Sequence, residues 1–130
     1  MMVDTSALVA ILKDEEDAQV YLEALARARQ SYIATPLLLE FNIVMLKNKT
    51  AESAVKYAQA LRELNVTDIP FTSVMAAQAT HAFLRYGKGR GGKAQLNFAD
   101  CMSYAASKVE AMPLLFKGDD FRHTDVVCAI

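Results

Sequence analysis

The chain has 130 residues and a mass of 14.3 kDa, which fits one domain over residues 1–130 and leaves no room for two of ordinary size. Apolar residues make up 53% and charged residues 22% of the sequence, a balance that excludes disorder as its main state. The 14 basic residues are matched by 15 acidic ones, which excludes a protein that holds nucleic acid mainly by overall positive charge. A role with nucleic acid would depend on a local basic patch, or on a bound metal that offsets acidic side chains.

The apolar runs of the sequence are short. They reach about a dozen residues, against the roughly 20 needed to span a bilayer, so no membrane segment is expected. No basic stretch followed by an apolar run opens the chain, so no secretory signal is expected either. Cys101 and Cys128 lie among apolar neighbours, and we expect both to be buried and reduced. These features together predict a cytoplasmic protein.

Hydrophobic periodicity predicts the elements of the first part of the chain. Residues 1–5 are expected to form a short strand, and Ser6 is expected to cap a helix at 7–13. Because residues 7–13 are apolar on every side, a buried strand is the alternative for them. An amphipathic helix is then predicted at 15–29, where apolar side chains recur at helical spacing.

A Thr-Pro pair marks the start of the next helix. Residues 31–34 are predicted to form a strand, after which Thr35 is expected to cap a helix with Pro36 in its first position. This helix is expected to run to about Asn48. The elements that follow are predicted as a helix at 51–64, a strand at 66–70 and a helix at 73–86.

A glycine-rich stretch then interrupts the pattern. Four of the five glycines lie within 87–93, which predicts a flexible loop. The remaining elements are predicted as a helix at 95–110, a strand at 114–117, a turn at 118–121 and a strand at 126–128. Strands that alternate with helices are typical of an α/β domain whose mostly parallel sheet is covered by helices.

Acidic residues occur where such a fold is expected to bind a ligand. In an open parallel sheet, ligands bind outside the carboxyl ends of the strands. Asp4 ends the first predicted strand, and Asp119 and Asp120 follow the predicted strand at 114–117. These carboxylates can therefore lie at the same edge of the sheet.

Two further acids are predicted on helices in apolar surroundings. Glu40 shares a helical stripe with apolar residues, where a carboxylate is costly unless it is paired or binds a cation; an ion pair with Lys47 or Arg62 is the structural alternative. Asp100 lies one turn into its predicted helix, where a favourable interaction with the helix N-terminus is the alternative. The polar residues expected on the same face as Asp100 are Asn97, Ser103, Tyr104 and Ser107.

Several carboxylates that are brought together repel one another unless a cation neutralises them. Hard oxygen ligands suit Mg²⁺ or Mn²⁺. Zn²⁺ is disfavoured because His81 and His123 have no paired spacing with a cysteine or with each other. A carboxylate-bound Mg²⁺ keeps several waters, and one of them can be oriented to attack a phosphodiester. The acids therefore predict a metal site with phosphodiesterase chemistry.

Four blocks of the sequence carry these acids. They read MMVDTSALVAIL at 1–12, TPLLLEFNIVM at 35–45, LNFADCMSYAAS at 96–107 and LLFKGDDFRHTD at 114–125. In this order they resemble the PIN-domain family, and within it the VapC ribonuclease toxins of type II toxin–antitoxin systems. The resemblance covers the whole chain. It implies a three-layer α/β/α sandwich with a central, mostly parallel sheet, and endoribonuclease activity that depends on Mg²⁺, with Mn²⁺ as a substitute.

The resemblance also implies a site of four acids. Asp4, Glu40 and Asp100 match three of them, and the fourth is Asp119 or Asp120. We favour Asp119, with Asp120 in a capping or structural role. Asp4 and Asp100 are expected to contact the metal directly, whereas Glu40 and Asp119 are expected to hold metal-bound waters or a second metal.

Other polar residues near these blocks could support the site. Ser6 could contact a carboxylate or a metal-bound water, or simply cap a helix. Asn97 could orient Asp100, or it could only satisfy the backbone of the preceding loop. The candidates for RNA binding are the basic residues in and beside the glycine-rich loop, with an ordinary solvated loop as the alternative: Arg85, Lys88, Arg90 and Lys93.

The partners that the resemblance implies are an RNA substrate and a cognate VapB-type antitoxin, in a homodimer or a toxin–antitoxin hetero-oligomer. One alternative is a catalytically silent PIN-fold subunit of a repressing complex. A more distant alternative is a Mg²⁺-binding domain that is phosphorylated on aspartate. The order of the acids disfavours it, because such a domain has paired acids early in the chain, where only Asp4 is present.

Overall fold

The computed structural model describes residues 1–47 and 49–130. Within these residues, four parallel strands form one sheet in the order β3-β2-β1-β4. The strands are β1 (Met2–Val3), β2 (Ser31–Ala34), β3 (Val66–Ile69) and β4 (Leu114–Leu115). The α/β class and the parallel sheet predicted from the sequence are confirmed.

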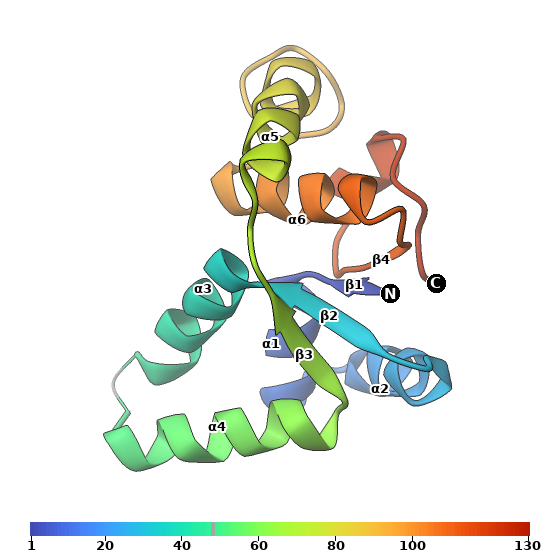
Figure 1. Cartoon of the computed structure of the whole chain (residues 1–130). Helices are drawn as coiled ribbons and strands as arrows, with labels where there is room; N and C mark the ends of the chain where they lie inside the picture. The colour runs from blue at the N-terminus through green and yellow to red at the C-terminus, as the bar shows by residue number, and fades with distance from the viewer. Residues whose placement is uncertain (48) are drawn as a thin grey trace.

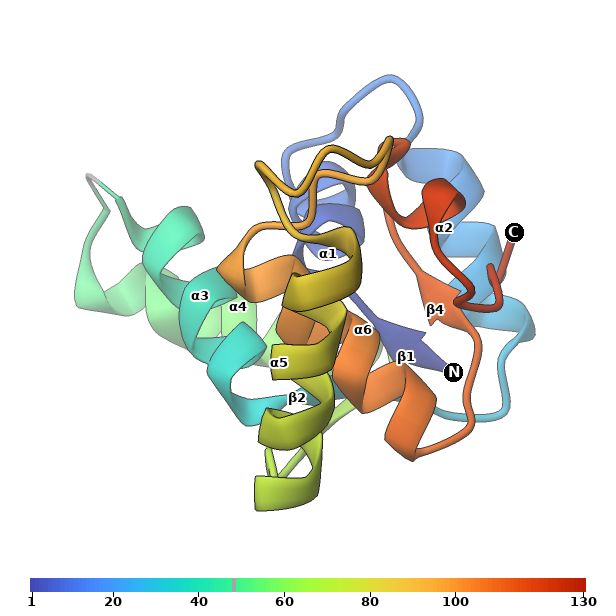
Figure 2. The same cartoon turned by 90° about the horizontal axis from the view of Figure 1, so that it is seen from above.

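Helices cover both faces of this sheet. Figure 1 shows α5 and α6 on one side of it and α1, α2 and α4 on the other, in the expected three layers. The helices are α1 (Thr5–Leu12), α2 (Ala18–Arg27), α3 (Thr35–Leu46), α4 (Ala51–Glu63), α5 (Ser73–Tyr86), α6 (Phe98–Val109) and the 3-10 helix η1 (Asp120–His123). Figure 2 shows η1 and the loop that follows α5 at the same end of the molecule.

The central strand β1 sets the position of the acids. Met2 and Val3 are fully buried and pair with Leu114 and Leu115 of β4. The N–H of Asp4 donates to the carbonyl oxygen of Leu115 at 2.9 Å, which continues this pairing by one residue. Because β1 and β4 are parallel, Asp4 and the residues that follow β4 emerge at the same edge of the sheet.

The start of α1 differs from the prediction. The run at 7–13 is helical rather than a strand, but the helix begins at Thr5 and its cap is Asp4, not Ser6. The Asp4 carboxylate accepts from the N–H of Ser6 at 2.9 Å. An aspartate that follows a strand can accept a hydrogen bond from one of the free N–H groups of the first helical turn. Asp4 does so here, and the helix therefore begins before the predicted cap, Ser6.

The start of α3 also differs. Thr35 is the first helical residue rather than the cap, and Pro36 follows it in the second position. Instead of capping the helix, the Thr35 hydroxyl accepts from the N–H of Phe71 at 3.3 Å. The helix ends at Leu46, and its predicted end at Asn48 lies outside the described residues.

The C-terminal part of the chain is less regular than predicted. The turn expected at 118–121 forms the 3-10 helix η1, and the strand expected at 126–128 is reduced to one bridge between Leu114 and Cys128. Both cysteines are free, but Cys128 is half-buried, whereas Cys101 is buried as predicted. None of the helices in the described residues is long and apolar enough to cross a membrane.

The loop after α5 begins at Gly87, whose backbone packs closely against Phe83. Gly87 packs so tightly that a Cβ on it would lie 2.4 Å from both the carbonyl oxygen and a ring carbon of Phe83. We expect Gly87→Ala to lower the free energy of unfolding by about 1–3 kcal/mol, because backbone must move to relieve the clash. Gly92 in the same loop has open space and no positive φ, so Gly92→Ala is the matched control. Denaturant titration of both variants checks this; equal losses would contradict it.

Candidate functional site

Asp4 is the most buried acid in the described chain, with 3% of its surface exposed. Its Oδ2 accepts hydrogen bonds from the N–H and the hydroxyl of Ser6, and its Oδ1 accepts from the hydroxyl of Ser103. A carboxylate in such surroundings needs these donors, because burying it without them would be unfavourable. The donors come from α1 and α6, so both helices determine the orientation of Asp4.

Ser6 also connects the acid to β4. Its Oγ accepts from the backbone N–H of Lys117 at 3.0 Å while its hydroxyl donates to Asp4. The Lys117 side chain turns elsewhere and binds Glu15 at 2.7 Å and Asp17 at 2.6 Å. These two carboxylates raise the pKa of Lys117 above its usual range, so its charge is used there rather than at Asp4.

Asp100 is held by a reciprocal pair of hydrogen bonds at the start of α6. Asn97 Oδ1 accepts from the N–H of Asp100 at 3.0 Å, and Asp100 Oδ2 accepts from the N–H of Asn97 at 2.7 Å. This capping box also explains why α6 begins at Phe98, three residues later than predicted. Asn97 therefore has two roles. Its backbone N–H orients the Asp100 carboxylate, and its side chain accepts from a free N–H at the start of the helix.

The pKa of Asp100 is raised to about 6. Burial is the largest cause, and the hydrogen bond from the Asn97 backbone opposes it. The negative charges of Asp4, Asp120 and Glu40 raise the pKa further. Asp100 therefore lies within the electrostatic range of three other carboxylates, one at the cap of α1, one in η1 and one in α3.

Glu40 is half-buried on α3 and faces the same group. Burial raises its pKa, the Thr5 hydroxyl lowers it, and the charge of Asp4 raises it again. The sequence offered an ion pair with Lys47 or Arg62 as the alternative role of Glu40. Neither ion pair forms in the part of the chain that is described.

The two adjacent acids after β4 are both exposed, but their neighbours differ. The Asp119 side chain is 88% exposed and lies 3.8 Å from Arg122. Asp120 is the first residue of η1, and it is Asp120 whose charge is among those that raise the pKa of Asp100. The negative charges of Asp4, Glu40 and Asp120 thus act on Asp100, and Asp119 is not among the acids that raise its pKa.

We name this set the acid group: Asp4, Glu40, Asp100 and Asp120. Over residues 1–47 and 49–130, no member forms an ion pair with a basic side chain, and no three acid, cysteine or histidine side chains converge closely enough to hold a metal ion by themselves. Carboxylate oxygens are the ligands that Mg²⁺ prefers, and their negative charge is not balanced by a basic side chain of the described residues. Mg²⁺ is usually held by one or two carboxylates and keeps water in its other positions, so it does not need three converging side chains.

Three of the basic residues proposed for RNA binding lie in the loop after α5, and the fourth lies near the end of α5. Lys88, Arg90 and Lys93 are exposed, and Arg90 stacks over the ring of Phe83 at 5.0 Å. Backbone hydrogen bonds join the two ends of the loop, and the side chain of Gln95 bonds to backbone groups within it. Arg85 lies on α5, 3.9 Å from Asp125.

Sequence reasoning did not select Ser103 as a site residue, although it noted Ser103 on the polar face of α6. Ser103 is fully buried and donates to Asp4 across 99 positions of sequence. The signal that could have found it is a serine three residues after Asp100, on a helix whose other residues from Cys101 to Ser107 are all buried. A buried hydroxyl needs a partner, and the nearby acid supplies it.

The chain is similar to known proteins along its whole length. The model of the PIN domain matches residues 1–127. Ribonuclease VapC28 of Mycobacterium tuberculosis is 39% identical over 130 residues, which are 100% of this chain and 98% of that protein. Ribonuclease VapC of Mycolicibacterium smegmatis is 42% identical over 126 residues, which are 97% of each chain.

Solved structures share the fold at lower sequence identity. The Mycobacterium tuberculosis toxin VapC20, described as cleaving the sarcin-ricin loop, superposes with a TM-score of 0.74 at 17% identity and covers 97% of this chain and 95% of its own. A structure of VapBC2 from Rickettsia felis, bound to a DNA fragment, superposes with a TM-score of 0.74 at 19% identity, covering 98% and 95%.

Replacing Asp100 by Asn tests whether the negative charge of Asp100 destabilises the folded protein. The pKa of Asp100 is 3.8 in model compounds and about 6 here, so its ionisation destabilises the fold at pH 8 and this penalty disappears as the pH falls through 6 toward 3.8. Asn keeps the capping oxygen. We expect Asp100→Asn to be more stable at pH 8, by about 1 kcal/mol once solvent screening is allowed for.

The measurement is the free energy of unfolding at pH 8 and pH 4, where the gain should vanish. Glu52→Gln, which removes a surface ion pair with Lys56 on α4, is the control. A variant that is less stable than the wild type at pH 8 would show that Asp100 is not repelled by its neighbours.

Proposed function

The chain belongs to the PIN domain family, and on that premise we propose that it is a metal-dependent endoribonuclease toxin of the VapC type. The observation that carries the proposal is the acid group, whose negative charges raise the pKa of Asp100 and have no cation of the described chain beside them. The relatives named ribonucleases support RNA as the substrate.

Asp4 and Asp100 are the residues that we propose to hold Mg²⁺ or Mn²⁺. Each has one orientation, since Ser6 and Ser103 hold Asp4 and the capping box holds Asp100. When bound, the metal would act as a Lewis acid on the scissile phosphate. Fixed carboxylates place such a charge without reorganisation during the reaction.

Glu40 and Asp120 complete the proposed site, through metal-bound waters or a second metal. We propose Asp120 in place of Asp119, because the charge of Asp120 raises the pKa of Asp100, whereas Asp119 lies 3.8 Å from Arg122. The exposed basic residues of the loop after α5 are proposed to bind the RNA backbone: Lys88, Arg90 and Lys93. They are a local patch on a chain whose net charge is −1.

A cognate antitoxin of the VapB type is the proposed inhibitor. Solved neighbours include a toxin–antitoxin complex from Klebsiella pneumoniae, which superposes with a TM-score of 0.71. Apolar side chains that stay exposed on α3 to α6 support a protein partner, either antitoxin or a second copy of the chain: Leu39, Ile43, Val55, Phe83 and Phe98. The cytoplasmic location predicted from the sequence belongs to the same proposal, as does the treatment of residues 1–130 as one PIN domain.

RNA cleavage by the purified, antitoxin-free protein tests the activity. We expect cutting with Mg²⁺ or Mn²⁺, none with EDTA, and a loss on the order of a hundredfold in Asp4→Asn and Asp120→Asn, because each removes a charge from the metal centre. Asp119→Asn is the matched control beside Asp120 and should cut within about twofold of the wild type.

Equal cutting by Asp4→Asn and the wild type would identify a contaminating nuclease. A wild type that binds antitoxin but cuts no RNA with either metal would favour the alternative of a silent PIN-fold subunit.

The metal requirement is expected to depend on pH. Protons and metal compete for Asp100, whose pKa is about 6 in the metal-free protein. Below that pH the Mg²⁺ concentration for half-maximal cleavage should rise by about tenfold per pH unit, and above it the concentration should level off. Mg²⁺ titrations of the cleavage rate at pH 5.0, 6.0 and 7.5 measure this. A Mg²⁺ requirement that stays constant from pH 5.0 to 7.5 would remove Asp100 from the proposed metal ligands.

A further inference from the structure

The C-terminal segment that carries Asp120 begins against the acid group. The backbone N–H of Lys117 donates to Ser6, and Ser6 donates to Asp4. Gly118 then turns the chain with a φ of 99°, a conformation that favours glycine. Asp120 follows two residues later, as the first residue of η1. The first end of the segment is therefore anchored beside Asp4.

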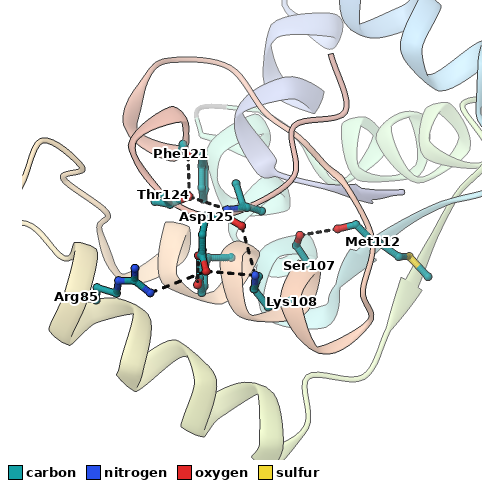
Figure 3. Close-up of polar contacts among 9 residues, drawn as sticks. Arg85, Ser107, Lys108, Met112, Phe121, Thr124 and Asp125 are labelled. Atoms are coloured by element: carbon teal, nitrogen blue, oxygen red, sulfur yellow. Dashed lines mark hydrogen bonds and ion pairs between the residues drawn. The ribbon is translucent and has the colours of Figure 1, made fainter.

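Asp125 anchors the other end of this segment (Figure 3). Its Oδ1 accepts from the hydroxyl of Tyr104 at 2.6 Å, and Lys108 Nζ donates to its Oδ2 at 3.4 Å and to its carbonyl oxygen at 3.3 Å. Arg85 lies 3.9 Å from the same Oδ2. The hydrogen bond from Tyr104 outweighs burial and holds the pKa of Asp125 below its usual range, so the carboxylate is ionised and keeps these partners.

Contacts within the segment make it stiff between the two anchors. The Phe121 side chain is buried, and its ring lies 4.9 Å from that of Phe116. The Thr124 hydroxyl donates to the carbonyl oxygen of Phe121 at 2.7 Å, as Figure 3 shows. η1 is one short turn that begins at Asp120 and ends at His123, so only a few residues separate Asp120 from Asp125.

The second anchor is attached to the helix that supplies Asp100. Tyr104 follows Asp100 by four residues, so the two residues lie one turn apart on the same face of α6. Tyr104 is buried and cannot adjust its position freely. The bond from Tyr104 to Asp125 therefore determines where the C-terminal segment lies relative to Asp100.

We propose that Asp125 is a positioning residue of the candidate metal centre, which acts by placing Asp120 opposite Asp100. Asp125 does not touch the substrate in this view; it controls the distance between two carboxylates of the acid group. The inference deepens the proposed function and rests on it, since the acid group has to bind a metal for the distance to matter.

A purely structural role for Asp125 predicts a different result. Its ion pairs with Lys108 and Arg85 are partly exposed, and such pairs contribute little to stability. If Asp125 only held the C-terminus in place, its removal would lower the melting temperature and leave the kcat of the folded protein unchanged. If it acts through Asp120, kcat falls in protein that is still folded.

The test uses the full chain with Mg²⁺ and a single-stranded RNA. Asp125→Asn removes the charge, and Tyr104→Phe removes only the hydroxyl, so one variant remains informative if the other does not fold. We expect kcat to fall on the order of tenfold in each, with KM within about twofold, because a misplaced group affects the reacting geometry more than binding. Glu52→Gln, which removes a surface ion pair on α4, is the control.

A double variant separates action through Asp120 from action elsewhere. Asp120→Asn combined with Asp125→Asn should be no slower than Asp120→Asn alone, because a positioning residue has nothing left to position. Losses that multiply would overturn the proposal. A rise in KM at constant kcat would overturn it too, and would point to the basic loop through Arg85 instead.

Mn²⁺ binding, followed by electron paramagnetic resonance without RNA, gives a readout that does not depend on cleavage. The Kd for Mn²⁺ should rise by about tenfold in Asp125→Asn and stay unchanged in Glu52→Gln. A wild type that binds Mn²⁺ but cuts no RNA would refute the proposed function, while the comparison of Kd values still decides the role of Asp125. A wild type that binds no Mn²⁺, or equal Kd values, would overturn the positioning role.

Discussion

The buried carboxylate of Asp4 is the constraint on which the rest of the structure depends. It lies at the end of the central strand with 3% exposure, where an ionised group needs hydrogen-bond donors around it. Ser6 supplies them from α1, Ser103 supplies one from α6, and Lys117 joins Ser6 to the end of β4. The same bonds that make the burial of Asp4 tolerable therefore join a strand and two helices at the edge where the site lies.

The acid group does not stabilise the fold of the metal-free chain. Burial and the charges of neighbouring carboxylates raise the pKa of both Asp100 and Glu40, so ionisation of these groups opposes folding near neutral pH. A fold selected only for stability would pair or replace such residues. Their presence at one edge of the sheet is therefore an argument for a bound cation, and it is independent of the similarity to named ribonucleases.

Helix α6 carries most of the geometry of the candidate site. Its capping box orients Asp100, its Ser103 holds Asp4, and its Tyr104 holds Asp125. The helix is buried from Cys101 to Ser107 and packs on the sheet, so these polar side chains have little freedom. One helix thus relates Asp4 and Asp100 to the C-terminal segment that bears Asp120.

The sequence by itself determined the α/β class and the order of most elements, and it singled out three acids as candidates for the site. These depend on local patterns: hydrophobic periods, a strand that ends in Asp4, and carboxylates among apolar neighbours at Glu40 and Asp100. Because such signals are contained within a few residues, tertiary contacts do not alter them. Helix caps were less predictable, since the Thr35 hydroxyl bonds to Phe71 rather than to its own helix.

Only the tertiary structure offers a reason to prefer Asp120 to Asp119 as the fourth acid. The two are identical neighbours in sequence, but in the structure the charge of Asp120 raises the pKa of Asp100, whereas Asp119 lies beside Arg122. Ser103 likewise acquires its role from a contact with Asp4 across 99 positions. Pairings of this kind depend on how separate elements pack, and no local pattern encodes that packing.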